Sequence, residues 1–174
     1  MAVHDNMERR RAAAATAAPG LKLAGYAALF DTETRIGDFT EVIRRGAFSA
    51  SLEENDVLCL VDHDPARLLG RTSSGTLRLE EDAAGLRYEL DLPDTQEGRD
   101  LYTMARRGDL GGMSFGFYVR EGGDRWTGQR RELLAVDLLE ISVVHSWPAY
   151  SGTTVEPRAR RAALARARLF LETV

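Results

Sequence analysis

Short apolar segments of strand length, separated by glycine and charged turn residues, constrain the fold of this chain more than any other feature. Segments 76–80 and 85–91 alternate apolar and polar residues, and the loop between them ends at Gly85, which predicts a β-hairpin. Segments 21–30, 57–63 and 138–147 are apolar runs, and further strands are expected at 114–120 and 130–136. Many strands favour a closed or strongly bent sheet, because closure removes exposed edges.

Helices are expected in only a few places. Segment 94–108 carries a capping residue at Asp94 or Thr95, Glu97 in its first turn and Gly108 at its end. A shorter helix is predicted at 46–54, where Phe48 and Leu52 share one face. The predicted fold class is therefore mainly β with flanking helices, an α+β protein.

The length of 174 residues fits one domain. Residues 1–20 contain an arginine cluster and an alanine run, which predict a flexible or marginally helical N-terminal arm. Residues 21–156 form the predicted domain, and the arginine- and alanine-rich residues 157–174 predict a helical tail.

Composition excludes several classes of function. The net charge of −4 argues against a nucleic-acid partner, which needs a clustered positive face. No apolar stretch approaches the ~20 residues that cross a bilayer, so no membrane segment is expected. Three histidines and one cysteine show no metal-ligand spacing, so neither a metal nor another cofactor is expected. Cys59 lies in an apolar run and is predicted to be a small buried hydrophobe.

Two residues have the chemistry of a nucleophile and its base. Ser114 follows two glycines, which leave backbone N–H groups uncovered, so an oxyanion region is expected around Gly112 and Phe115. His63 stands at the end of an apolar strand, where alternation places it on one face with Val61 and the other odd-numbered residues.

The third catalytic position has two candidates, Glu140 and His145. Glu140 interrupts a deeply apolar strand, and a buried carboxylate there costs several kcal/mol unless it is paired. The two candidates lie five residues apart, so they face opposite sides of a regular strand and only one should reach the site. A structural pair of Glu140 with an arginine is the alternative to a catalytic role.

A serine esterase is also weighed, because Gly112 to Gly116 match the Gly-x-Ser-x-Gly pattern. That pattern works in a turn between a strand and a following helix, whereas a strand is expected to follow Ser114. The esterase interpretation is therefore disfavoured.

An ordered set of motifs resembles the tailed-phage prohead maturation proteases over about residues 21–150. The set consists of these segments: Gly25-Tyr26-Ala27-Ala28-Leu29-Phe30, Glu41-Val42-Ile43-Arg44-Arg45-Gly46-Ala47-Phe48, Asp62-His63-Asp64, Leu69-Gly70-Arg71, Gly85-Leu86, Arg107-Gly108-Asp109-Leu110, Gly112-Met113-Ser114-Phe115-Gly116-Phe117, Asp137-Leu138-Leu139-Glu140-Ile141-Ser142-Val143-Val144 and Pro148-Ala149. His145 is a departure from the small or hydroxylated residue expected at its position in relatives.

This resemblance implies a β-barrel similar to the herpesvirus assemblins and a serine endopeptidase. The implied substrate is scaffold, or the scaffold-like arm of the major capsid protein, inside the immature procapsid in the host cytoplasm, or from a prophage. It favours Glu140 as third residue beside Ser114 and His63, and it suggests a homodimer and the portal as a further partner. The alanine-rich composition of the N-terminal arm and the C-terminal tail suggests that both are removed by self-processing. A non-catalytic β-barrel that binds capsid or scaffold protein is the rival.

Overall fold

A computed structural model describes residues 7–12, 16–18 and 20–146 of the chain. None of the helices in these residues is long and apolar enough to span a membrane. The predicted helical tail at 157–174 lies outside the described residues.

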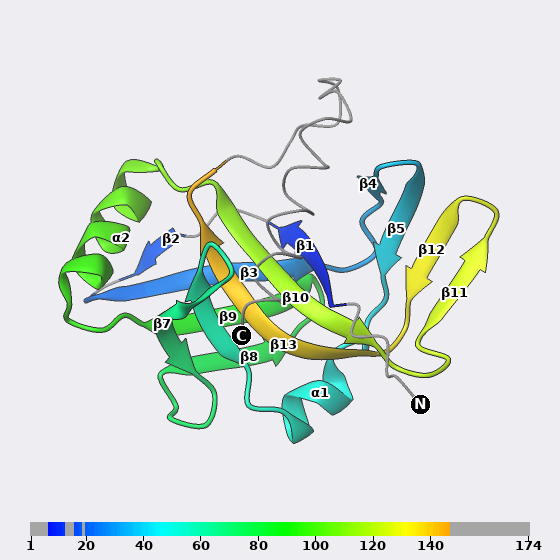
Figure 1. Cartoon of the computed structure of the whole chain (residues 1–174), viewed down its shortest axis with the longest axis horizontal. Helices are drawn as coiled ribbons and strands as arrows, with labels where there is room; N and C mark the ends of the chain where they lie inside the picture. The colour runs from blue at the N-terminus through cyan, green and yellow to red at the C-terminus, as the bar shows by residue number, and fades with distance from the viewer. Residues whose placement is uncertain (1–6, 13–15, 19, 147–174) are drawn as a thin grey trace, which may run out of the picture.

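In the part of the chain that the structure describes, the strands form three sheets (Figure 1). The first has the order β1-β10-β13-β6-β7, the second β11-β12-β5-β4 and the third β2-β3-β9-β8. The bounds in the first sheet are β1 Glu8–Ala12, β10 Gly112–Val119, β13 Val136–Val144, β6 Leu58–Val61 and β7 Asp64–Arg71. In the second they are β11 Asp124–Thr127, β12 Arg130–Leu133, β5 Phe39–Ile43 and β4 Thr34–Ile36. In the third they are β2 Thr16–Ala18, β3 Lys22–Leu29, β9 Gly85–Asp91 and β8 Leu77–Glu81.

The prediction of a mainly β fold with flanking helices is confirmed, but in the described residues the strands do not close into a barrel. Each of the three sheets keeps two ends. The first sheet is mixed, because β13 pairs antiparallel with β10 and parallel with β6. The first and third sheets pack face to face instead, so burial of one face of each sheet takes the place of closure.

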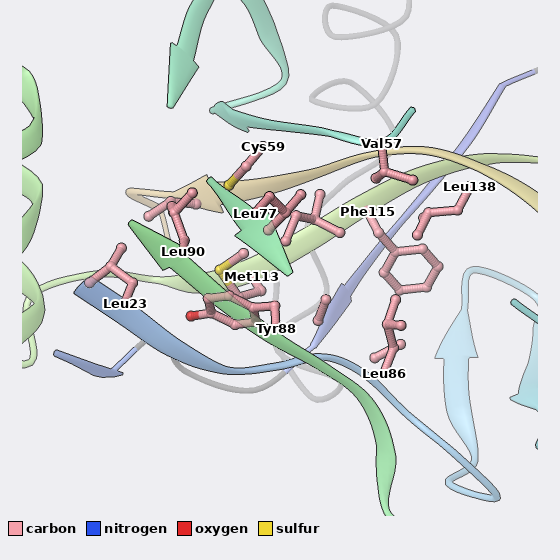
Figure 2. Close-up of a cluster of buried hydrophobic side chains, with 14 of the residues drawn as sticks. Leu23, Val57, Cys59, Leu77, Leu86, Tyr88, Leu90, Met113, Phe115 and Leu138 are labelled. Atoms are coloured by element: carbon pink, nitrogen blue, oxygen red, sulfur yellow. The ribbon is translucent and has the colours of Figure 1, made fainter. Parts of the chain in front are cut away.

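The core lies between these two sheets (Figure 2). This cluster includes residues of both sheets, among them Met113 and Phe115 of β10, Leu138 of β13, and Tyr88 and Leu90 of β9. Cys59 is fully buried in the same cluster, which confirms its predicted character, and this burial raises the pKa of its thiol.

The longer helix, α2 (Gln96–Arg107), is confirmed with its predicted signals. The Thr95 side chain accepts a hydrogen bond from Gly98 N at 3.2 Å, and Gly108 ends the helix in the left-handed conformation. Gly98 weakens a helix in isolation, yet a Cβ there would lie 2.0 Å from the Pro93 carbonyl oxygen. The close approach of the chain before α2 therefore requires glycine. The shorter helix, α1 (Ser49–Glu54), is also confirmed, beginning after Phe48.

The described parts of the predicted arm are strands rather than helix. β1 is an edge strand on β10, and β2 is an edge strand on β3. Figure 1 shows β1, in dark blue, alongside β10. Strand β1 therefore extends the sheet in which Ser114 and Glu140 lie.

Candidate active site

His63 is presented by a two-residue turn between β6 and β7. Val61 pairs with Asp64, and the two residues between them, Asp62 and His63, have φ angles of 51° and 63°. Positive φ at both positions is the requirement of a type I′ hairpin turn. Non-glycine residues rarely adopt it, although Asp and His are among those that tolerate it best. The predicted strand therefore stops at Val61, and alternation does not determine where His63 points.

Contacts with the end of β13 hold this turn. Asp62 N donates to the Val143 carbonyl at 2.9 Å, and His63 N donates to Ser142 Oγ at 3.2 Å. His145 N donates to Asp62 Oδ1 at 3.0 Å, and His145 Nδ1 lies 2.7 Å from Asp62 Oδ2. Burial opposes ionisation of the Asp62 carboxyl, but these bonds from His145 outweigh it and lower the pKa of Asp62. The backbone cost of the turn is thus offset by bonds to a neighbouring strand.

The imidazole of His63 lies against a buried carboxylate. His63 Nδ1 is 2.6 Å from Glu140 Oε1, and Ser142 Oγ donates to Glu140 Oε2 at 2.6 Å. The exposed fractions of the two side chains are 16% for His63 and 6% for Glu140. An ionised carboxylate only accepts hydrogen bonds, so this geometry assigns the proton of a neutral imidazole to Nδ1. Nε2 then carries the lone pair that can accept a proton.

Gly116 makes room for this carboxylate. It is the register partner of Glu140 on β10, and a Cβ there would lie 2.5 Å from Glu140 Oε1. The carboxylate therefore rests over the backbone of β10. Since His63 reaches that same oxygen while its backbone bonds Ser142, its ring crosses β13 toward β10.

Ser114 lies on the same face of the sheet. Its register partner on β13 is Ser142, and directly opposed residues of antiparallel strands project to the same side. The register irregularity of this pair falls after Gly116, so it does not separate Ser114 from the Glu140 position. Ser114, Ser142 and Glu140 therefore share one face, with His63 laid over it.

The Ser114 hydroxyl itself is buried and donates to the Arg10 carbonyl at 2.6 Å. A bond between Ser114 and His63 is not among the contacts found in the described residues. Strand β1 thus covers the hydroxyl in this conformation.

The residues predicted to surround the oxyanion, Gly112 and Phe115, both lie on β10. Gly112 begins β10 with φ 129°, opposite Val144. Phe115 stacks on Phe117 in the core with 5.5 Å between ring centroids, and its backbone lies between β1 and β13. Alternate N–H groups of such a strand point to each neighbour, so those directed at β1 are the ones that an incoming carbonyl can reach.

His145 is one-third exposed and contacts Asp62, whereas Glu140 contacts His63. The structure therefore brings Glu140, and not His145, to the His63 ring. Glu140 contacts His63 and Ser142, and these contacts do not decide the predicted alternative of a structural pair with an arginine.

Sequence reasoning missed Ser142, Gly116 and Asp62. Ser142 carried a usable signal, because it lies two residues beyond Glu140 and so faces the same side of the strand. Gly116 and Asp62 carried no such signal in the local sequence, because their roles depend on register and on a turn formed with another strand. Among the described residues, no group of His, Cys, Asp and Glu side chains could hold a metal ion.

A serine on a strand, an imidazole on the same face and a buried carboxylate on its Nδ1 are the residue types that a serine hydrolase site requires. The family model described as Caudovirus prohead serine protease matches residues 6–167 of the chain. The chain belongs to that family and is a serine protease of phage capsid maturation. No curated protein and no solved structure matches it.

Proposed function

We propose that this protein cleaves scaffold, or the scaffold-like arm of the major capsid protein, with Ser114 as nucleophile, His63 as general base and Glu140 as the group that orients the base. The family supports the substrate class, since a prohead protease acts on proteins of the immature shell. The observation that carries the residue roles is the 2.6 Å contact between His63 Nδ1 and Glu140 Oε1, which leaves Nε2 as the proton acceptor.

The first half of the reaction forms an acyl-enzyme. His63 Nε2 accepts the Ser114 proton while the hydroxyl oxygen bonds to the scissile carbonyl carbon. Backbone N–H groups near Gly112 and Phe115 would stabilise the oxyanion. The C–N bond then breaks, and the imidazolium returns its proton to the leaving amine.

Water completes the reaction. It attacks the acyl carbon, gives its proton to His63 Nε2 and releases the new carboxylate as Ser114 recovers its hydrogen. Glu140 stabilises the imidazolium in both halves without itself taking the proton. General base catalysis contributes roughly 10²–10⁴-fold to such a reaction.

The setting of the reaction is part of the proposal. The protein would work inside the procapsid in the host cytoplasm, with capsid and scaffold proteins as partners and the portal nearby. The arm at 1–20 and the tail at 157–174 would flank a protease domain at 21–156 and would be removed by self-processing. An assemblin-like homodimer stays a prediction.

Co-expression with the scaffold-bearing capsid protein tests the proposal. Ser114→Ala should abolish cleavage while shells still assemble, whereas Ser74→Ala, a change of the same size on an exposed turn, should cleave like the parent. Unchanged cleavage by the Ser114→Ala protein would remove this residue from the mechanism. Intact-mass analysis of the active parent that finds both termini retained would exclude self-processing.

A further inference from the structure

Strand β1 occupies the edge of β10 that carries the nucleophile. Residues Glu8 to Ala12 pair antiparallel with Phe117 to Met113, so Arg11 lies opposite Ser114. The other edge of β10 is taken by β13. An extended peptide can reach Ser114 by adding a strand to β10, and β1 is an extended peptide bound in that way.

The carbonyl of Arg10 is the group of β1 that the structure records in contact with the Ser114 hydroxyl. Ser114 Oγ donates to the carbonyl oxygen of Arg10 at 2.6 Å. In this arrangement the hydroxyl proton points at the carbonyl oxygen instead of His63, so the contact is a resting state and not an attack. It nevertheless locates a backbone carbonyl of the bound strand at the serine.

The side chain of Arg10 enters a subsite with a buried carboxylate. Arg10 Nη2 donates to Glu41 Oε2 at 2.9 Å, and Arg10 Nε also bonds Glu41 Oε1. The guanidinium lies over the Phe117 ring, 5.5 Å from its centroid. Glu41 is only 3% exposed, so its charge must be neutralised by cations that reach it there.

One cation of this subsite belongs to the domain and one to the strand. Arg131 Nη1 lies 3.3 Å from Glu41 Oε2, and it also pairs with Glu8 of β1 and Asp124 of β11. The closer, two-oxygen partner of Glu41 is Arg10. Planar two-point pairing of this kind favours a guanidinium over other side chains.

We infer that the edge of β10 on which β1 lies is the substrate-strand site, that Glu41 and Phe117 form a subsite for the basic side chain on the amino side of the cleaved bond, and that β1 holds this site closed. The inference rests on the proposed function and specifies its substrate: an extended segment with arginine, or less favourably lysine, directly before the scissile bond. Because β1 is tethered, it competes at a high effective concentration, so substrate must displace it.

The cleavage site in the capsid or scaffold protein tests the subsite. Terminal mass analysis of the products should find arginine or lysine at the new carboxyl end. Replacing that residue by glutamine in the substrate should lower kcat/KM roughly 10²-fold, as for truncation of one partner of a buried charge pair. A product that ends in an uncharged or acidic residue would overturn the subsite.

Two variants of the full chain test which residues form it. Glu41→Gln should erase most of the difference between the basic and the glutamine substrate, whereas Glu80→Gln, on an exposed β8 position, should keep it. Thermal unfolding shows whether the Glu41→Gln protein is folded. A folded Glu41→Gln protein that keeps the parental preference for the basic substrate would contradict the assignment.

A further variant of the full chain tests whether β1 closes the substrate-strand site. Arg10→Ala should raise kcat/KM on the parental substrate several-fold, while Arg107→Ala, which removes an exposed arginine paired with Asp109, should not. An Arg10→Ala protein with unchanged or lower kcat/KM would overturn the closed state. Failure of the proposed function looks different: Ser114→Ala would then cleave like the parent, whatever the substrate residue.

Discussion

The described residues contain two histidine–carboxylate pairs that differ little in distance and greatly in exposure. His63 Nδ1 lies 2.6 Å from Glu140, and His145 Nδ1 lies 2.7 Å from Asp62. The exposed fractions are 16% and 6% in the first pair and 36% and 38% in the second. Distance alone therefore does not distinguish the pair that we propose to be catalytic from the other one.

Burial and second partners make the difference. Glu140 is fixed on both oxygens, by His63 and Ser142, on the face that Ser114 shares. Water and salt screen the exposed pair, so it contributes little beyond holding the turn. The exposed pair thus holds the backbone that presents His63, while the buried pair occupies Nδ1 and leaves Nε2 as the nitrogen that acts as base in the proposed mechanism.

Changing the buried carboxylate should have the largest effect. Glu140→Gln keeps the volume, but its amide can donate to Nδ1 and so favour the wrong tautomer of His63. The kcat/KM for capsid-protein cleavage should fall roughly 10³–10⁴-fold, as when the orienting carboxylate of a serine-protease triad becomes an amide. A loss below tenfold in a folded variant would show that Glu140 does not orient the base.

A substitution that fills the space above Gly116 should have the next largest effect. Gly116→Ala places a methyl group 2.5 Å from Glu140 Oε1, so the carboxylate must move although both of its oxygens are held. We expect kcat/KM to fall roughly 10²-fold, because an error of about 1 Å in a catalytic group has that effect. Gly122→Ala is the matched change for glycine loss, since its added Cβ would contact nothing within 4 Å, although its φ of 68° costs some stability.

The exposed pair should matter least. His145→Ala leaves Asp62 its bonds from the backbone of residue 145 and from Arg67. We expect kcat/KM to change about twofold and the free energy of unfolding by less than about 1 kcal/mol. A loss of catalysis as large as that of Glu140→Gln would reverse the two roles.

Acid should remove even this small contribution to stability. The pKa of Asp62 is lowered on folding, so its stabilisation is full above the ordinary value of 3.8 and is lost as the pH falls through the folded-state value. The melting temperature of the parent should exceed that of His145→Ala at pH 6, and the difference should shrink well below pH 3.8. A difference that grows in acid would contradict this assignment.

Local signals predicted much of this molecule. The signals concerned involve residues that are close together in the sequence. They are the cap and stop residues of α2, the alternation in β8 and β9, and the isolated charge of Glu140 in an apolar strand. What the sequence did not predict depends on distant partners. The left-handed turn at His63 is held by β13, and β1 forms a strand because β10 offers it an edge and Glu41 a partner for Arg10.

The prediction of a closed barrel was wrong for the same reason. The alternation of apolar and polar residues along a strand indicates that one face of the strand is buried. It does not indicate which sheet covers that face. Here β12 pairs with β5 in a sheet of its own, so the strands divide into three groups.

The proposed mechanism requires that one imidazole nitrogen, Nε2 of His63, accepts the proton of the Ser114 hydroxyl. The rate of phosphonylation by a fluorophosphonate measures this directly. In the parent and in Arg10→Ala, which frees the site, peptide mapping should place a single adduct on Ser114. His63→Ala should slow its formation at least roughly 10²-fold. An adduct on another serine, or labelling of Ser114 that is equally fast without His63, would contradict the account.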